Sequence, residues 1–80
     1  MILKISRGYI KVELGSRVAS VPGEMFFPGN YKLGFVVYSD MIKFWDSPDV
    51  NMPISEADKA LILEGIRNDF TRSGHTLEIE

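Results

Sequence analysis

The residues of this chain that could do chemistry are few, and they do not form a catalytic or metal-binding set. His75 is the single histidine and there is no cysteine, whereas a zinc site takes about four Cys, His or carboxylate ligands. Nucleophilic catalysis needs a nucleophile, an adjacent base and an oxyanion donor, and nothing pairs with His75 in the sequence. Asp46 and Asp49 lack the spacing of an EF-hand calcium loop. We therefore expect a binding protein with no enzymatic activity, no cofactor and no metal.

Charge is the first feature that suggests a partner. The net charge is −2, but residues 44–58 carry four acidic side chains and neither lysine nor arginine, whereas residues 1–43 carry six basic and three acidic ones. Each acid has a local explanation as a turn former or as a residue at a helix start. Together they still create a negative field, which steers a cationic partner and raises its association rate.

Trp45 stands at the start of this acidic segment. Residues 41–45 alternate as a strand does, with Ile42 and Phe44 on one face. If those two face the core, Trp45 lies on the outer face as an interface anchor; otherwise it packs under the loop of residues 46–53. We hypothesise a partner-binding surface made of Trp45, Asp46, Asp49, Glu56 and Asp58.

The elements that must position these residues follow from periodicity. Period-two alternation and turn residues predict extended segments, and the apolar stretch 33–38 suits a central strand covered on both faces. Pro22-Gly23 should turn the chain, and residues 46–53 should form a loop. The extended segments are 2–6, 9–14, 17–21, 24–27, 33–38, 41–45 and 76–80.

One good helix is predicted after the loop. Ser55 is a candidate N-cap with Asp58 three residues on, and Gly74 is a natural C-terminal cap. Ile62, Leu63, Ile66 and Phe70 form one stripe, and Leu61 falls on nearly the opposite side. The fold class is therefore α+β: a twisted antiparallel sheet of about five to six short strands, one C-terminal helix packed on a face, and a final edge strand.

The whole chain, 1–80, is expected to be one domain. Residues 1–14 lack the continuous apolar core of a secretory signal, and the longest apolar run, 35–38, is too short to span a bilayer. With no cysteine, this points to the cytoplasm and to no membrane partner. The alternative is a small nucleic-acid-binding or regulatory module on the basic N-terminal strands, but the pI of 5.3 argues against it. Its candidate residues are Arg7, Tyr9, Lys11 and Arg17.

Several segments together also suggest a family. They are Arg7-Gly8-Tyr9-Ile10, Pro22-Gly23-Glu24, Gly34-Phe35-Val36-Val37-Tyr38, Ile42-Lys43 with Trp45, and Ile54-Ser55-Glu56 with Lys59. In this order, over most of the chain, they resemble immunity protein 74, a family of short immunity proteins from bacterial polymorphic toxin systems. The family typically has a second aromatic or proline soon after the tryptophan, where Asp46-Ser47-Pro48 stands here.

The resemblance implies a cytoplasmic antidote that binds and neutralises a cognate toxin domain of a polymorphic toxin or contact-dependent inhibition system. Many such toxins are nucleases with cationic clefts, which an acidic surface would complement. The resemblance carries over no catalytic residue. The oligomeric state stays open, a homo-oligomer included.

Overall fold

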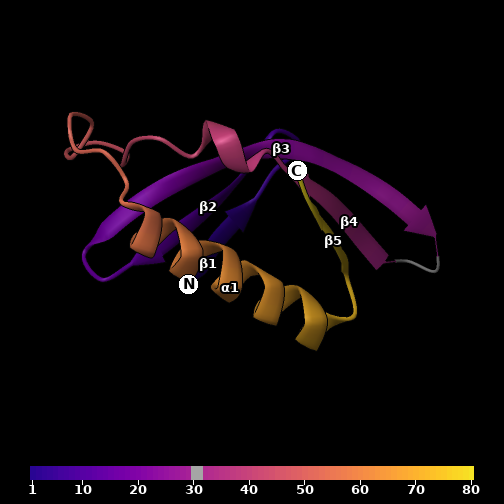
Figure 1. The fold of residues 1–80 in the computed structure, drawn as a ribbon. Helices are drawn as coiled ribbons and strands as arrows, with labels where there is room; N and C mark the ends of the chain where they lie inside the picture. Colours follow the sequence, from indigo (N-terminus) through magenta and orange to yellow (C-terminus); the bar gives the residue numbers. More distant parts are fainter. Residues whose placement is uncertain (30–31) are drawn as a thin grey trace.

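A twisted sheet carries one long helix across one of its faces (Figure 1). The computed structural model describes residues 1–29 and 32–80. Within them the strands are β1 (Ile2–Ile5), β2 (Tyr9–Leu14), β3 (Arg17–Gly29), β4 (Lys32–Val37) and β5 (Thr76–Ile79), and the helices are the short 3₁₀ helix η1 (Ser39–Met41) and α1 (Glu56–Ser73). No helix in these ranges is long and apolar enough to cross a membrane.

The five strands lie side by side in the order in which they occur in the chain. Successive pairs are antiparallel from β1 to β4, whereas β4 and β5 are parallel. The chain leaves β4 and returns through α1, and such a crossover allows the next strand to run in the same direction. The α+β class, the C-terminal helix and the final edge strand are confirmed, and only the last strand pair departs from the expected antiparallel arrangement.

The turn predicted at Pro22-Gly23 is wrong, because β3 runs straight through these two residues and joins two halves of the sheet. Pro22 is the last partner of β2, and Gly23 is the first partner of β4. A proline has no N–H to contribute at this change of partner, and its carbonyl accepts from the Tyr38 N–H at 2.9 Å. A Cβ on Gly23 would lie 2.0 Å from the Val36 carbonyl oxygen, so glycine permits the close approach of β4.

The predicted helix is confirmed in position and in register. Ser55 Oγ accepts from the Asp58 N–H at 3.1 Å, and Gly74 ends the helix with φ of 72°. The buried residues of α1 are Ile62, Ile66 and Phe70; Leu63 packs partly buried against them. Leu61 is 51% exposed, as its opposite position on the helix predicts.

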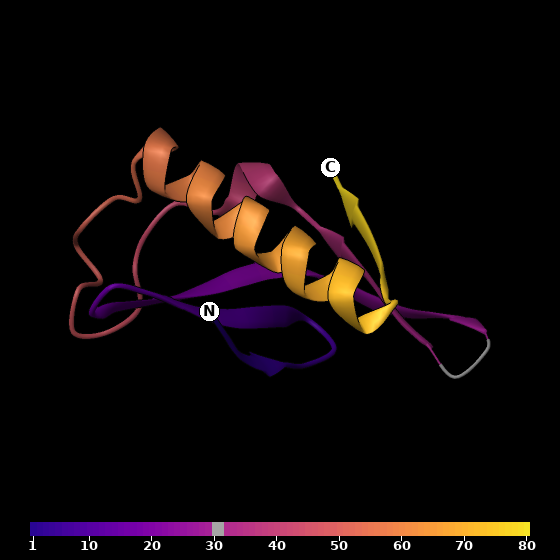
Figure 2. The same cartoon turned by 90° about the horizontal axis from the view of Figure 1, so that it is seen from below.

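The helix covers one face of the sheet only (Figure 2). Phe35 and Val37 of β4 are fully buried on the helix side, with Leu77 and Ile79 of β5 packed beside them. The expectation that β4 is covered on both faces is therefore wrong. On the face away from the helix, Gly34 lies under the ring of Phe26, whose nearest atom would be 2.4 Å from an added Cβ.

Candidate partner-binding surface

The segment that follows β4 is a small hairpin and not the strand predicted over residues 41–45. After η1, Phe44 makes a single antiparallel bridge with Pro53. The Trp45 N–H donates to the Met52 carbonyl at 3.2 Å, and the Ile54 N–H donates to the Lys43 carbonyl at 2.8 Å. Residues 46–51 close this unit as the predicted loop, and we refer to it as the 43–54 hairpin.

The position of Trp45 contradicts its assignment to the outer face. The side chain is 3% exposed, whereas its neighbour Phe44 is 55% exposed. Ile42 is also buried, so two consecutive exposed residues separate it from Trp45 and break the period of two. The break lies beyond η1, whose 3₁₀ turn ends at Met41, and falls at Lys43 and Phe44, where the chain enters the hairpin. Trp45 therefore packs under the hairpin.

Asp46 fastens the hairpin to the sheet. β4 pairs only with the second half of β3, which leaves one edge of the first half open. The Asp46 N–H donates to the Val18 carbonyl at 2.8 Å, and its carboxylate accepts from the Ser20 N–H at 3.1 Å and from Ser20 Oγ at 2.8 Å. The side chain thus replaces a strand carbonyl, which satisfies edge groups that would otherwise lack partners.

The three other predicted acids are not engaged in this way. Asp49 is half-buried, and its backbone forms the two turns of the hairpin loop. Glu56 is exposed at the first position of α1, and Asp58 is half-buried two residues later in the same turn. The structure therefore places these acids on the hairpin loop and the helix N-terminus, two segments adjacent in the chain.

A pocket of about 340 Å³ lies next to Trp45. Arg17 contributes one positive charge to this acidic region, since its guanidinium lies 5.7 Å from the centroid of the Trp45 ring. The indole N–H is buried without a hydrogen-bond partner among the residues that the structure describes. The residues that line the pocket are Leu14, Gly15, Ser16, Arg17, Trp45 and Asp58.

Sequence reasoning missed the exposed apolar residues of this region. Phe44, Val50 and Met52 are 55%, 54% and 39% exposed, and Met41 is 58% exposed at the end of η1. A signal was available, since apolar residues inside a short loop rich in proline and acids have little core within reach. The hairpin thus presents apolar side chains where we expected mainly carboxylates.

The basic residues of the first strands are only partly brought together. Lys4 and Lys11 are register partners on β1 and β2, next to Tyr9 on the face away from the helix. A side-chain hydrogen bond with Ser6 and the charges of both lysines lower the pKa of Tyr9. Arg17 lies elsewhere, over Trp45. The aromatic–basic group of the nucleic-acid alternative is therefore divided between two sites.

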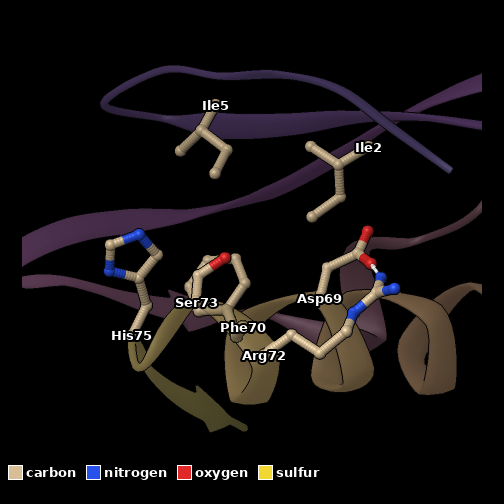
Figure 3. A pocket seen from close by; sticks show the side chains of 7 residues that line it. All are labelled: Ile2, Ile5, Asp69, Phe70, Arg72, Ser73 and His75. Carbon is tan, nitrogen blue, oxygen red and sulfur yellow. Dashed lines mark hydrogen bonds and ion pairs between the residues drawn. The ribbon is translucent and has the colours of Figure 1, made fainter.

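A second pocket, of about 320 Å³, lies between β1 and the C-terminal end of α1 (Figure 3). Ile2 and Ile5 point into it from β1, opposite Phe70, while Asp69 and Arg72 form an ion pair along the helix. His75 is at its end, but its Nδ1 accepts from the Leu33 N–H at 2.9 Å. This histidine therefore has a structural role between the helix and β4.

Comparison with known proteins gives one result. The family model described as Immunity protein 74 matches residues 2–80, nearly the whole chain. No curated protein and no solved structure matches it. Metal-ligating clusters of three or more His, Cys, Asp or Glu are absent from the described residues.

Proposed function

The chain belongs to the immunity protein 74 family, whose members neutralise a cognate toxin, and we propose that its target is a cationic nuclease domain. The family is not enzymatic, so neutralisation proceeds by binding. The observation that supports a cationic target is the segment 44–58, with four acids and no lysine or arginine. We also propose that binding occurs in the cytoplasm, where a nuclease toxin would reach its substrate.

The physical reason lies in what a nuclease must attract. Its cleft binds a phosphate backbone, which requires clustered lysine and arginine side chains. An acidic surface competes for the same cleft and accelerates the encounter by electrostatic steering. Asp49, Glu56 and Asp58 supply this charge in our proposal. Asp46 adds charge as well, although its carboxylate also bonds Ser20.

Trp45 contributes differently from the role first expected. Because it is buried beneath the hairpin, it supports the acidic loop and does not contact the toxin directly. Its replacement by alanine would remove a large core side chain and destabilise the fold. A binding test must therefore use residues outside the buried core.

The test is a kinetic titration with the cognate toxin domain. Asp49→Asn with Glu56→Gln should slow association, and the deficit should shrink as salt rises, because screening weakens steering between exposed charges. Glu64→Gln with Glu78→Gln is the matched control, since both glutamates are exposed and the net charge changes equally. Equal slowing of association by both pairs would contradict the assignment of the binding surface to segment 44–58. A toxin domain that does not cleave nucleic acid would exclude the nuclease target.

A further inference from the structure

We infer that the outer face of the 43–54 hairpin, formed by Phe44 and Pro53, is an apolar anchor that enters a pocket on the cognate toxin. This inference rests on the proposed function, in that it assumes toxin binding through this part of the chain. It differs from the acidic surface in naming an uncharged contact, and it assigns the aromatic role to Phe44 in place of Trp45.

The hydrogen bonds of the hairpin determine which side chains share a face. The Trp45–Met52 and Ile54–Lys43 bonds flank the Phe44–Pro53 pair on both sides. This makes it a non-hydrogen-bonded antiparallel pair, the type in which facing side chains come closest. Phe44 and Pro53 therefore lie together on one face, and both are exposed.

The next residue on each arm points to the opposite face. Trp45 and Ile54 are 3% and 9% exposed and belong to the core cluster. Strand alternation then requires Phe44 to point away from the core. The hairpin is consequently apolar on both faces, although only the inner face packs against the rest of the chain.

The base of this anchor is held in place before any partner arrives. Asp46 bonds both Val18 and Ser20 of β3, and the Trp45 ring lies between the core and Arg17. A side chain on a fixed backbone loses less conformational freedom when it binds. Aromatic residues on such supports are typical hot spots of protein interfaces.

The surroundings define the chemistry of the partner. Four of the eight large apolar side chains that are exposed in the described residues lie between residues 41 and 52: Met41, Phe44, Val50 and Met52. Single exposed apolar residues are ordinary and contiguous apolar patches mark interaction sites, so this concentration, with Phe44 and Pro53 side by side, supports the inference. The acids of segment 44–58 stand next to them. The complementary surface is therefore an apolar pocket with basic side chains at its rim.

Charge also argues against a second copy of this chain as the occupant. A symmetric contact through the hairpin would bring two acidic segments of the same sign together, which is unfavourable. A cationic toxin domain would instead bring charges of opposite sign together. The anchor and the acids then act in different steps, because apolar burial mainly slows dissociation whereas exposed charges mainly speed association.

The experiment compares Phe44→Ala with Phe27→Ala in binding to the cognate toxin domain. Phe27 is 76% exposed at the far end of β3, so it controls for loss of any exposed phenylalanine. We expect Phe44→Ala to raise Kd at least tenfold through faster dissociation at all salt concentrations, and Phe27→Ala to bind like the wild type. Phe44→Leu, which keeps an apolar side chain, should lie between the two and serves if the alanine variant does not fold.

The outcomes separate the inference from the proposed function. If Phe44→Ala and Phe44→Leu both bind the toxin domain like the wild type, the inference is overturned, but the toxin-binding function is not. A wild-type chain that does not bind the toxin domain overturns both. A dimer that sedimentation detects in the wild type and not in Phe44→Ala would identify the face as a self-association surface and would also overturn the inference.

Discussion

The helix-covered face of the sheet and its open face are made of the same strands, yet they differ in the side chains that they carry and in how these are packed. On the covered face, Ile10, Val21 and Phe35 have no exposed surface and meet Ile62 and Ile66 of α1. Buried polar or charged residues are absent from the described part of the chain. The covered face therefore supplies the stability of the fold, and substitutions there should cost most.

The open face carries polar and charged side chains beside half-buried apolar ones such as Phe26, and its two halves differ in charge. Tyr9 lies near Lys4 and Lys11 on the first strands, whereas Tyr38 lies near Glu24 and Glu80. Burial raises the pKa of Tyr38, and the two carboxylates raise it further. β3 therefore joins a basic and an acidic half of one sheet, and the open side has no core of its own.

The largest effect is expected from the covered face. Phe70 is 2% exposed, and its replacement by alanine should lower the free energy of unfolding by about 3–5 kcal/mol, because it removes buried apolar area and leaves a cavity. Denaturant unfolding measures this directly. Leu61→Ala, on the exposed side of the same helix, should change stability by about 0.5 kcal/mol or less; the reverse order would contradict the helix register.

The second-largest effect is expected from replacing a glycine by alanine, and it can be compared between the two faces. Gly23→Ala should cost about 1–3 kcal/mol, because the new Cβ would meet the Val36 backbone, which cannot move without disturbing the sheet. Gly34→Ala should cost less, since its Cβ would meet only the half-buried Phe26 ring, which can rotate away. Thermal or denaturant unfolding of both variants tests the difference. Equal losses would show that the open face is packed as tightly as the covered one.

A smaller effect is expected at the edge of β3. Asp46→Ala removes both acceptors of Ser20 in a partly buried position and should cost about 1 kcal/mol. Asp46→Asn should cost less, because its amide can still accept from the Ser20 N–H and donate to Oγ. Hydrogen exchange of the Ser20 amide reports the bond itself, and protection that persists in Asp46→Ala would contradict the proposed role.

The smallest effect is a difference in titration between the two halves of the open face. Tyr9 should ionise at a lower pH than Tyr38, since hydrogen bonding with Ser6 and the lysine charges lower its pKa, whereas burial and two carboxylates raise that of Tyr38. Lys4→Gln with Lys11→Gln should raise the Tyr9 pKa, and Glu24→Gln should lower the Tyr38 pKa. NMR titration of ring-labelled tyrosine measures both, and Tyr→Phe variants assign the signals.

Much of the fold was readable from the sequence, because local signals and periodicity agreed. Ser55, Asp58 and Gly74 placed the ends of α1, and the spacing of Ile62, Ile66 and Phe70 placed its buried stripe. The strands over residues 9–14 and 76–79 followed from alternation. The acidic character of residues 44–58 is likewise a property of composition, which no packing can change.

Tertiary structure decided what local signals could not. Pro22-Gly23 reads as a turn, yet β2 and β4 offered partners on opposite edges, so the chain continued as a strand. The alternation of residues 41–45 allowed Trp45 to be the exposed aromatic, but Lys43 and Phe44 are both exposed, and this shift of phase left Trp45 buried and Phe44 outside. Which of the two aromatic side chains is exposed depended on this shift, because in an extended chain a displacement of one residue exchanges the two faces.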